Sequence, residues 1–399
     1  MLQSLVTRTQ RISTTSRSML LLSALALVLA PAAVVRPLAQ AAPQATPQTA
    51  TLPARLSDAA FWKLATDTSE PGGYFRITDN YTSNEGEVAQ VWTRLRDRGI
   101  NGGVYLGVGP EQNFSYIAAV RPAMAFILDI RRQAAMQHLL FKAVFELATD
   151  RADFIAILFS KPRPSALAPA SPIQDTWNTF ATIATDPAVA EKNLARILDL
   201  LTKKHEFALG AEDAALLQAV YRDFTSFGPV ISTRGTGAGN ALTFADLTGW
   251  MQDEAGVVRS FLATEDDFQF VKGLHERNLI VPVTGDFGGP KALRGLATYI
   301  KGAGATVSAF YVSNVEQYLF MDGKDRAFYD SVAMLPLTET SVFIRPYSLR
   351  RGGRGFGRGG FSPAQPSAAA EPLCPVQGFL KAVAGGRILS NNDAMTCGR

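Results

Sequence analysis

The apolar residues of this chain fall into short continuous runs that alternate with helical repeats. The runs at 104–109 and 123–130 are bounded by turns, a pattern typical of buried parallel strands. The stretch between them has Pro110 in its first turn and predicts a helix. We therefore predict a parallel strand, helix and strand over residues 102–130.

The same alternation returns in the second half of the chain. It predicts strands at 279–284 and 305–312, with a helix at 290–304 between them, and a further strand at 340–346. This last strand is expected near an edge of the sheet, because Pro346 has no N–H to donate. The alternation predicts an α/β protein with a doubly wound, mostly parallel, Rossmann-like sheet.

Helical spacing of apolar residues predicts a helix over about 85–98 and one long helix over 131–160. Four prolines at 161–172 end that helix, and the mostly helical block that follows is interpreted as an insertion that can cover a pocket as a lid. The expected organisation is a leader at 1–41, a linker at 42–55, the first half of the sheet domain at 56–160, the insertion at 161–245, the second half at 246–347 and a Gly/Arg-rich linker with a C-terminal tail at 348–399.

The first 41 residues have the composition of a signal peptide. They carry four arginines and no acidic residue, then an apolar run at 19–35 and small residues before a cleavage site after Ala41. We expect an exported protein, periplasmic or secreted; the alternative is an uncleaved membrane anchor, although Pro31 interrupts the run. Without this leader, 35 basic residues balance 35 acidic ones, so no nucleic-acid partner is expected.

Both cysteines lie near the C-terminus. In an exported chain, Cys374 and Cys397 are expected to form a disulfide, and the alternative is two free thiols. A zinc site is not expected, because no histidine stands beside them. The arginine- and glycine-rich stretch at 349–360 is interpreted as a flexible linker or a contact for anionic envelope polymers.

The turn after the first strand is the main candidate binding site. Gly107 and Gly109 allow the chain to approach a ligand closely, and the free amides of the following helix favour an anion or carboxylate. Asp129 ends the next strand, where an acidic side chain suits the hydroxyls of a ribose. Alternatively, the glycines serve packing, and Asp129 forms an ion pair with Arg131 or Arg132. The candidate cofactor-binding residues are Gly107, Gly109, Glu111, Asn113, Asp129 and Arg131.

Three polar residues that follow the later strands are the catalytic candidates. Asp286, Asn314 and Glu316 could hold a polar ligand or act as a base and its orienting partner. The alternative for Asp286 and Asn314 is that each caps a helix.

Other charged residues have weaker patterns. The acidic run at 265–267 could bind a divalent cation, but Thr264 before it favours a helix start. Arg131, Arg132 and Lys142 could meet an anion at the mouth of the pocket or be solvated. No metal is expected, since the spacing of His138, His205 and His275 is not that of metal ligands.

Residues 102–132 resemble the core of class I S-adenosylmethionine-dependent methyltransferases. The resemblance implies that Gly107 and Gly109 lie near the methionine part of that cofactor and that Asp129 binds its ribose. This chain departs from the pattern in two places. Where such enzymes often have an acidic residue two positions before the first glycine, it has Tyr105, and where they have the third glycine, it has Glu111. The dinucleotide fingerprint also fails, because position 112 is glutamine.

A closer resemblance covers the strings at 107–132, 260–295 and 310–320, which are similar to uncharacterised bacterial proteins, some of them exported, with a methyltransferase-like core. This family has no established activity, so the closer resemblance adds only the expectation of export. The methyltransferase-like core is what implies binding of S-adenosylmethionine or another small, polar, nucleoside-like ligand. If the protein is an enzyme, it is expected to be a methyltransferase-like transferase. The alternative is a non-catalytic secreted or envelope-associated binding protein on a repurposed Rossmann-like fold.

Overall fold

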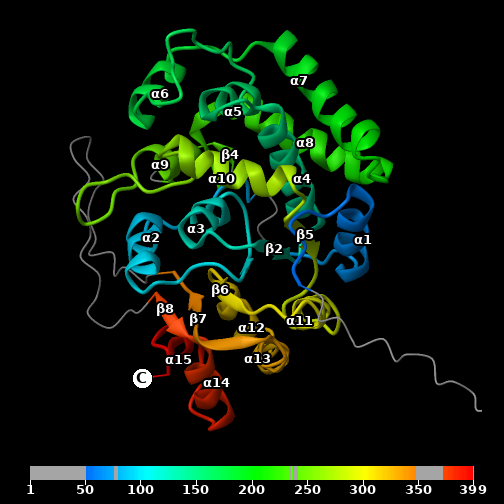
Figure 1. The fold of residues 1–399 in the computed structure, drawn as a ribbon, viewed down its shortest axis with the longest axis vertical. Helices are drawn as coiled ribbons and strands as arrows, with labels where there is room; N and C mark the ends of the chain where they lie inside the picture. Colours follow the sequence, from blue (N-terminus) through cyan, green and yellow to red (C-terminus); the bar gives the residue numbers. More distant parts are fainter. Residues whose placement is uncertain (1–50, 76–79, 234, 237–240, 347–371, 399) are drawn as a thin grey trace, which may run out of the picture. The chain divides into compact units, whose positions relative to one another are not determined.

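The computed structural model describes residues 51–75, 80–233, 235–236, 241–346 and 372–398 (Figure 1). The expected leader at 1–41 and the arginine- and glycine-rich stretch at 349–360 lie outside the described residues. The strands of the main sheet are β1 (Val104–Gly107), β2 (Met124–Asp129), β5 (Ile280–Thr284), β6 (Val307–Tyr311), β7 (Leu337–Ile344) and β8 (Leu373–Pro375).

The main sheet has the order β5-β2-β1-β6-β7-β8. The first five strands of that order run parallel, and β8 pairs with β7 in the antiparallel sense. The chain starts at β1 in the middle, builds outward through β2 to β5, then crosses back to β6. This is a doubly wound Rossmann-like sheet, so the predicted fold class is confirmed.

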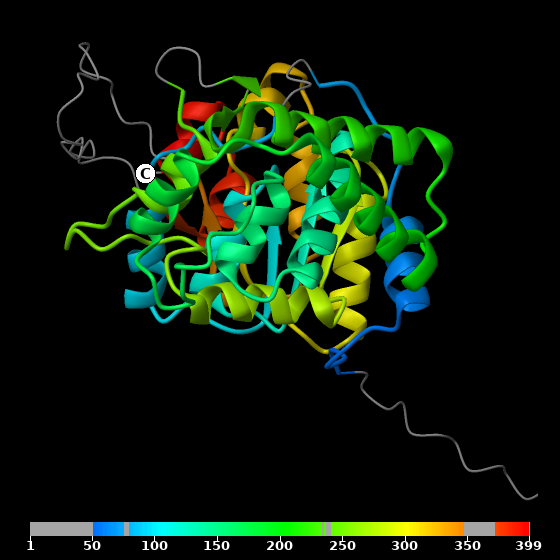
Figure 2. The ribbon, with the colours of Figure 1, turned by 90° about the horizontal axis from the view of Figure 1, so that it is seen from above.

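The helices cover both faces of this sheet. Those from the body of the chain are α1 (Asp58–Thr68), α2 (Val88–Asp97), α3 (Gln112–Val120), α4 (Arg132–Leu147), α5 (Arg151–Leu158), α10 (Glu265–Glu276), α11 (Ala292–Gly302), α12 (Val315–Met321) and α13 (Asp325–Val332). Helices α3, α4 and α10 pack together on one face, and α1, α11 and α13 pack on the other (Figures 1 and 2). Every residue of β1, β2 and β5 is therefore buried, which explains their continuous apolar runs.

The long helix expected over 131–160 is two helices, α4 and α5. The break falls at Ala148–Asp150, where the Asp150 carboxylate accepts a hydrogen bond from the N–H of Asp153 and caps α5. The apolar periodicity continues across the break, so the sequence pattern does not reveal it.

The expected insertion is mostly helical. It contains α6 (Ile173–Ala181), α7 (Pro187–Asp199) with a π-helical turn at Leu200–Lys204, α8 (Ala211–Phe227), the short hairpin β3 (Ile231–Ser232) and β4 (Gly235–Thr236), and the start of α9 (Phe244–Gly249). Helix α8 packs along α4.

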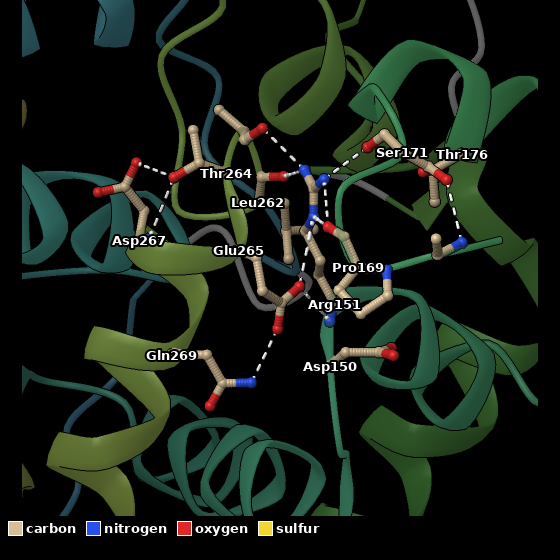
Figure 3. Close-up of polar contacts among 12 residues, drawn as sticks. Asp150, Arg151, Pro169, Ser171, Thr176, Leu262, Thr264, Glu265, Asp267 and Gln269 are labelled. Atoms are coloured by element: carbon tan, nitrogen blue, oxygen red, sulfur yellow. Dashed lines mark hydrogen bonds and ion pairs between the residues drawn. The ribbon is translucent and has the colours of Figure 1, made fainter.

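A single arginine ties the proline-rich loop at 161–172 to the chain that leads into α10. The guanidinium of Arg151 donates to the carbonyls of Leu262 (2.8 Å), Ala263 (2.7 Å), Pro169 (2.9 Å) and Ser171 (2.5 Å), as Figure 3 shows. Arg151 is buried, so these carbonyl groups supply hydrogen bonds that its charged guanidinium would otherwise form with water.

The C-terminal segment differs from the tail that we expected. Residues 373–395 add β8, α14 (Val376–Ala384) and α15 (Asn391–Met395). Strand β7 lies near the edge of the sheet, as expected, and β8 forms the edge itself. A three-residue strand is too short to show a period in the sequence. The predicted disulfide between Cys374 and Cys397 is confirmed, and such a bond is compatible with an extracellular location. In the part of the chain that the structure describes, no helix is long and apolar enough to cross a membrane.

Candidate functional site

The carboxyl ends of β5, β2, β1 and β6 line one edge of the sheet, and the strand order reverses between β1 and β6. Ligands of such sheets bind at this edge, beside the reversal. Residues 69–75 and 80–87, here named the edge segment, lie along it. The N–H of Glu70 donates to the carbonyl of Thr284, the last residue of β5, and the N–H of Gly73 donates to the carbonyl of Ile130, directly after β2. The edge segment thus covers the region where we expected a ligand.

The turn after β1 is organised around Asn113. Its side-chain N–H groups donate to the carbonyls of Val108, Gly109 and Pro110 at 2.7 to 3.1 Å, and its oxygen accepts from the Tyr105 hydroxyl at 3.0 Å. A Cβ atom at Gly107 would lie 1.9 Å from that oxygen. Gly109 has φ +77, which L side chains rarely adopt. Gly107 therefore has a packing role and Gly109 a conformational role, in addition to any role in binding.

Glu111, which precedes α3, joins this turn to the edge segment. Its two carboxylate oxygens accept from the N–H of Ser83 at 3.2 and 3.1 Å. Burial raises the pKa of Glu111 to about 8, against the opposing effect of the Ser83 amide. Behind the turn, the Nε2 of His138 lies 2.8 Å from the carbonyl of Gly109, and burial lowers the pKa of His138 to about 4, so the ring is neutral and donates.

Asp129 is paired with Arg131. Its Oδ1 accepts from the backbone N–H (2.9 Å) and Nε (3.0 Å) of Arg131, and its Oδ2 accepts from Nη2 (2.8 Å). A carboxylate offers about four acceptor positions, so one remains. Arg132 instead pairs with Asp213 of α8, at 2.6 Å. The ion-pair interpretation of Asp129 thus holds in this conformation, with Arg131 as its partner.

Sequence reasoning missed Glu70. Its carboxylate accepts from the N–H groups of Lys291 (2.8 Å) and Ala292 (2.7 Å), so Glu70 rather than Asp286 caps α11. Asp286 accepts from the N–H of Gly288 and pairs with Lys324 at 2.6 Å. The capping interpretation of Asp286 is wrong because helix α11 begins later than expected, at Ala292.

Asn314 and Glu316 do not face the β1–α3 turn together. Asn314 precedes α12, but its side chain makes no capping hydrogen bond. Glu316 is buried and binds the guanidinium of Arg345 (2.5 and 2.8 Å) and the hydroxyl of Tyr329 (2.7 Å). Its carboxylate therefore holds α12 against α13 and the end of β7.

The remaining candidates have structural partners. Thr264 caps α10, which confirms that interpretation of the acidic run, and Arg121 pairs with Asp266 and Asp267. Lys142 does not reach the edge: it is buried and pairs with Glu146 at 2.7 Å. Among the described residues, no three His, Cys, Asp or Glu side chains gather in a way that could hold a metal ion.

Sequence reasoning also missed a buried cluster around Glu85 of the edge segment. The Glu85 carboxylate accepts from the Ser313 hydroxyl (2.5 Å) and the Gln112 amide (3.4 Å), which lie at the ends of β6 and of the β1–α3 turn. The stretch at 82–87 is polar and has no period, so nothing in the sequence separates Glu85 from a surface residue.

The insertion holds the edge segment in place. The Asp223 carboxylate of α8 accepts from the Tyr81 hydroxyl at 2.5 Å, and the Thr233 hydroxyl donates to the carbonyl of Thr82 at 2.6 Å. The insertion therefore contacts the segment that covers the turn, which is the position that the lid hypothesis requires.

Comparison with known proteins gives one family. No curated protein matches the chain. The model of a family described as a domain of unknown function (DUF7790) matches residues 81–178 and 244–355, which together are more than half of the chain. The matched segments contain the β1–α3 turn, Asp129, Glu85 and the end of β6, and the gap between them falls in the insertion. The chain therefore belongs to this family, the domain of unknown function DUF7790.

Proposed function

We propose that the protein binds a small nucleoside-like ligand, with S-adenosylmethionine as the first candidate, at the edge formed by the carboxyl ends of β1, β2 and β6. The observation that carries the proposal is the reversal of strand order between β1 and β6. The Gly107–Gly109 turn and Asp129 adjoin that reversal, and a glycine turn followed by an acidic residue at the next strand end suits a nucleoside.

Ligand binding at this edge exchanges internal hydrogen bonds for bonds to the ligand. Asp129 has one acceptor position left beside Arg131, so a ribose with two hydroxyls displaces at least one donor of Arg131. Where the edge segment covers the turn, the hydrogen bond from Ser83 to Glu111 is replaced by bonds to the ligand in the same way. In the same conformational change, the edge segment parts from Asp223 and Thr233 of the insertion.

The second candidate is a non-catalytic binding protein of the cell envelope. It is favoured by the state of two of the three catalytic candidates: Asp286 is paired with Lys324, and Glu316 is buried with Arg345. A general base needs a carboxylate that can reach a substrate proton. Burial keeps Glu316 from one, and Asp286 reaches one only after it parts from Lys324. We therefore propose ligand binding as the function. Methyl transfer would be added to it only if an assay detected transfer of the methyl group to an acceptor.

The test is calorimetric titration of the full chain with S-adenosylhomocysteine and S-adenosylmethionine. The expected result is micromolar affinity, about −8 kcal/mol, that falls at least tenfold in Asp129→Ala. Arg131→Gln is expected to bind at least as tightly as the parent, because it removes the internal competitor for Asp129. Arg132→Gln is the matched control, since Arg132 pairs with Asp213. No binding by the folded parent would overturn the proposal.

A further inference from the structure

The cluster around Glu85 contains a buried carboxylate without a cationic partner. Glu85 is 8% exposed, and its hydrogen bonds come from neutral groups: the hydroxyls of Ser313 and Tyr311 and the amide of Gln112. Among the described residues, no lysine, arginine or histidine forms an ion pair with it. Burial raises the pKa of Glu85, and its hydrogen bonds with Ser313, Tyr311 and Gln112 offset this only in part.

Gln112 supplies a second, independent observation, an unpaired buried acceptor. Its side-chain nitrogen donates to the Tyr116 hydroxyl (2.7 Å) and to Glu85, but its oxygen has no hydrogen-bond partner although the residue is 3% exposed. An unpaired buried acceptor costs about 1 to 3 kcal/mol. Two acceptors therefore lie together, the Glu85 carboxylate and the Gln112 oxygen, and both lack a charged donor.

The neighbouring groups favour a positive charge. Glu87 makes no side-chain capping bond, and burial, followed by the charge of Glu85, raises its pKa to about 7. The rings of Tyr116 and Tyr311 lie 5.0 Å apart, and burial, followed by the negative charge of Glu85, raises the pKa of both hydroxyls, so neither tyrosine supplies a positive charge to the cluster. A metal ion does not fit, because no three ligating side chains gather here among the described residues. A primary ammonium fits, since it carries N–H donors for both acceptors and a full charge.

We propose that Glu85 and Gln112 bind an ammonium group carried by the ligand of the β1–α3 turn. The inference rests on the proposed function and specifies its ligand class: a nucleoside with a primary amine, not a neutral nucleoside. The position is consistent with one ligand that spans both sites, because Gln112 is the first residue of α3, directly after the turn. Asn84 and Asn314, next to the cluster in sequence, are exposed, so the cluster lies near the surface.

The experiment compares two probes that differ in the amine alone: S-adenosylhomocysteine and its deaminated analogue, which keeps the carboxylate. The parent is expected to bind the first at least tenfold more tightly. This preference is expected to disappear in Glu85→Gln, which is isosteric and keeps an acceptor for Ser313, and to weaken in Gln112→Leu. Glu276→Gln is the control, because Glu276 pairs with Lys272 on the surface of α10.

Proton release provides a readout that a purely structural role of Glu85 would not change. Burial raises the pKa of Glu85 and so favours its protonated form in the free protein, whereas a bound ammonium favours the ionised form. The binding heat of S-adenosylhomocysteine is therefore expected to vary with the ionisation enthalpy of the buffer in the parent and not in Glu85→Gln. Equal affinity of the parent for both probes would overturn this inference and leave the proposed function standing. Binding of neither probe would overturn both.

Discussion

At the scale of single residues, the β1–α3 turn depends on the absence of a side chain at Gly107. We expect Gly107→Ala to lower the free energy of unfolding by about 3 kcal/mol, because a Cβ displaces Asn113 from the three carbonyls that it satisfies. Urea unfolding measures this. In the control Gly273→Ala, no atom lies within 4 Å of the new Cβ, and α10 is expected to gain up to about 1 kcal/mol. Equal stabilities of the two variants would contradict this role of Asn113.

Glu111 makes stability depend on pH in a defined direction. Its pKa rises from 4.5 in the unfolded chain to about 8 in the fold, so the folded state holds the proton more tightly. The stabilisation is complete below about pH 4.5 and is lost as the pH rises through about 8. Glu111→Gln keeps an acceptor for Ser83 without a charge. Between pH 5 and pH 9, we expect the parent to lose on the order of 3 kcal/mol more than this variant.

Urea unfolding at the two pH values measures this difference. The exposed Glu191→Gln is the control and should keep the pH dependence of the parent. Parallel pH profiles of the parent and Glu111→Gln would mean that the carboxyl is ionised in the fold.

How far the site could be predicted depends on the range of each contact. The Gly107 turn and the pairing of Asp129 with Arg131 are local, and the sequence pointed to both. Glu85 meets Ser313, which is 228 residues away, and Glu70 caps a helix 222 residues away. No periodicity carries such information, because the meeting of these residues depends on the order of strands in the sheet.

At the scale of elements, Arg151 tests how the insertion is joined to the sheet domain. Lysine keeps the charge at this position but has one nitrogen, which does not reach carbonyls on both sides as the planar guanidinium does. We expect Arg151→Lys to lower the free energy of unfolding by about 3 kcal/mol and to speed proteolysis within 161–172. Arg196→Lys on the exposed side of α7 is the control. Unchanged proteolysis of the Arg151 variant would show that the loop is held by other contacts.

The elements that could be predicted are those whose contact with the core requires a periodic or continuous pattern of apolar residues. Strands β1, β2, β5 and β6 and helices α2, α3 and α11 were expected from their apolar patterns. The break between α4 and α5 was not expected. Both helices are buried, so their apolar pattern continues across the point where Asp150 caps α5. Strand β8 was missed because its pairing with β7 comes from tertiary contact rather than from a period of its own.

At the scale of the whole molecule, the disulfide holds the last strand and the C-terminal helices on the sheet. Cys374 lies in β8 and is fully buried, and the bond to Cys397 closes a loop that contains α14 and α15. Helix α14 also packs on β7, so the cross-link and this apolar contact act on the same edge of the sheet.

Closing a loop of 23 residues stabilises a fold by about 3 kcal/mol in the chain-entropy model. We therefore expect reductant to lower the midpoint of thermal unfolding of the parent. The double variant Cys374→Ala/Cys397→Ala is expected to unfold near the midpoint of the reduced parent, with or without reductant. Hydrogen exchange should then speed up most in residues 373–395, while the central strands β1 and β2, which pair on both sides, stay protected. A parent whose midpoint does not respond to reductant would show that packing on β7 alone holds this segment. In that case the bond would restrict the conformational entropy of the unfolded chain less than the length of its loop implies.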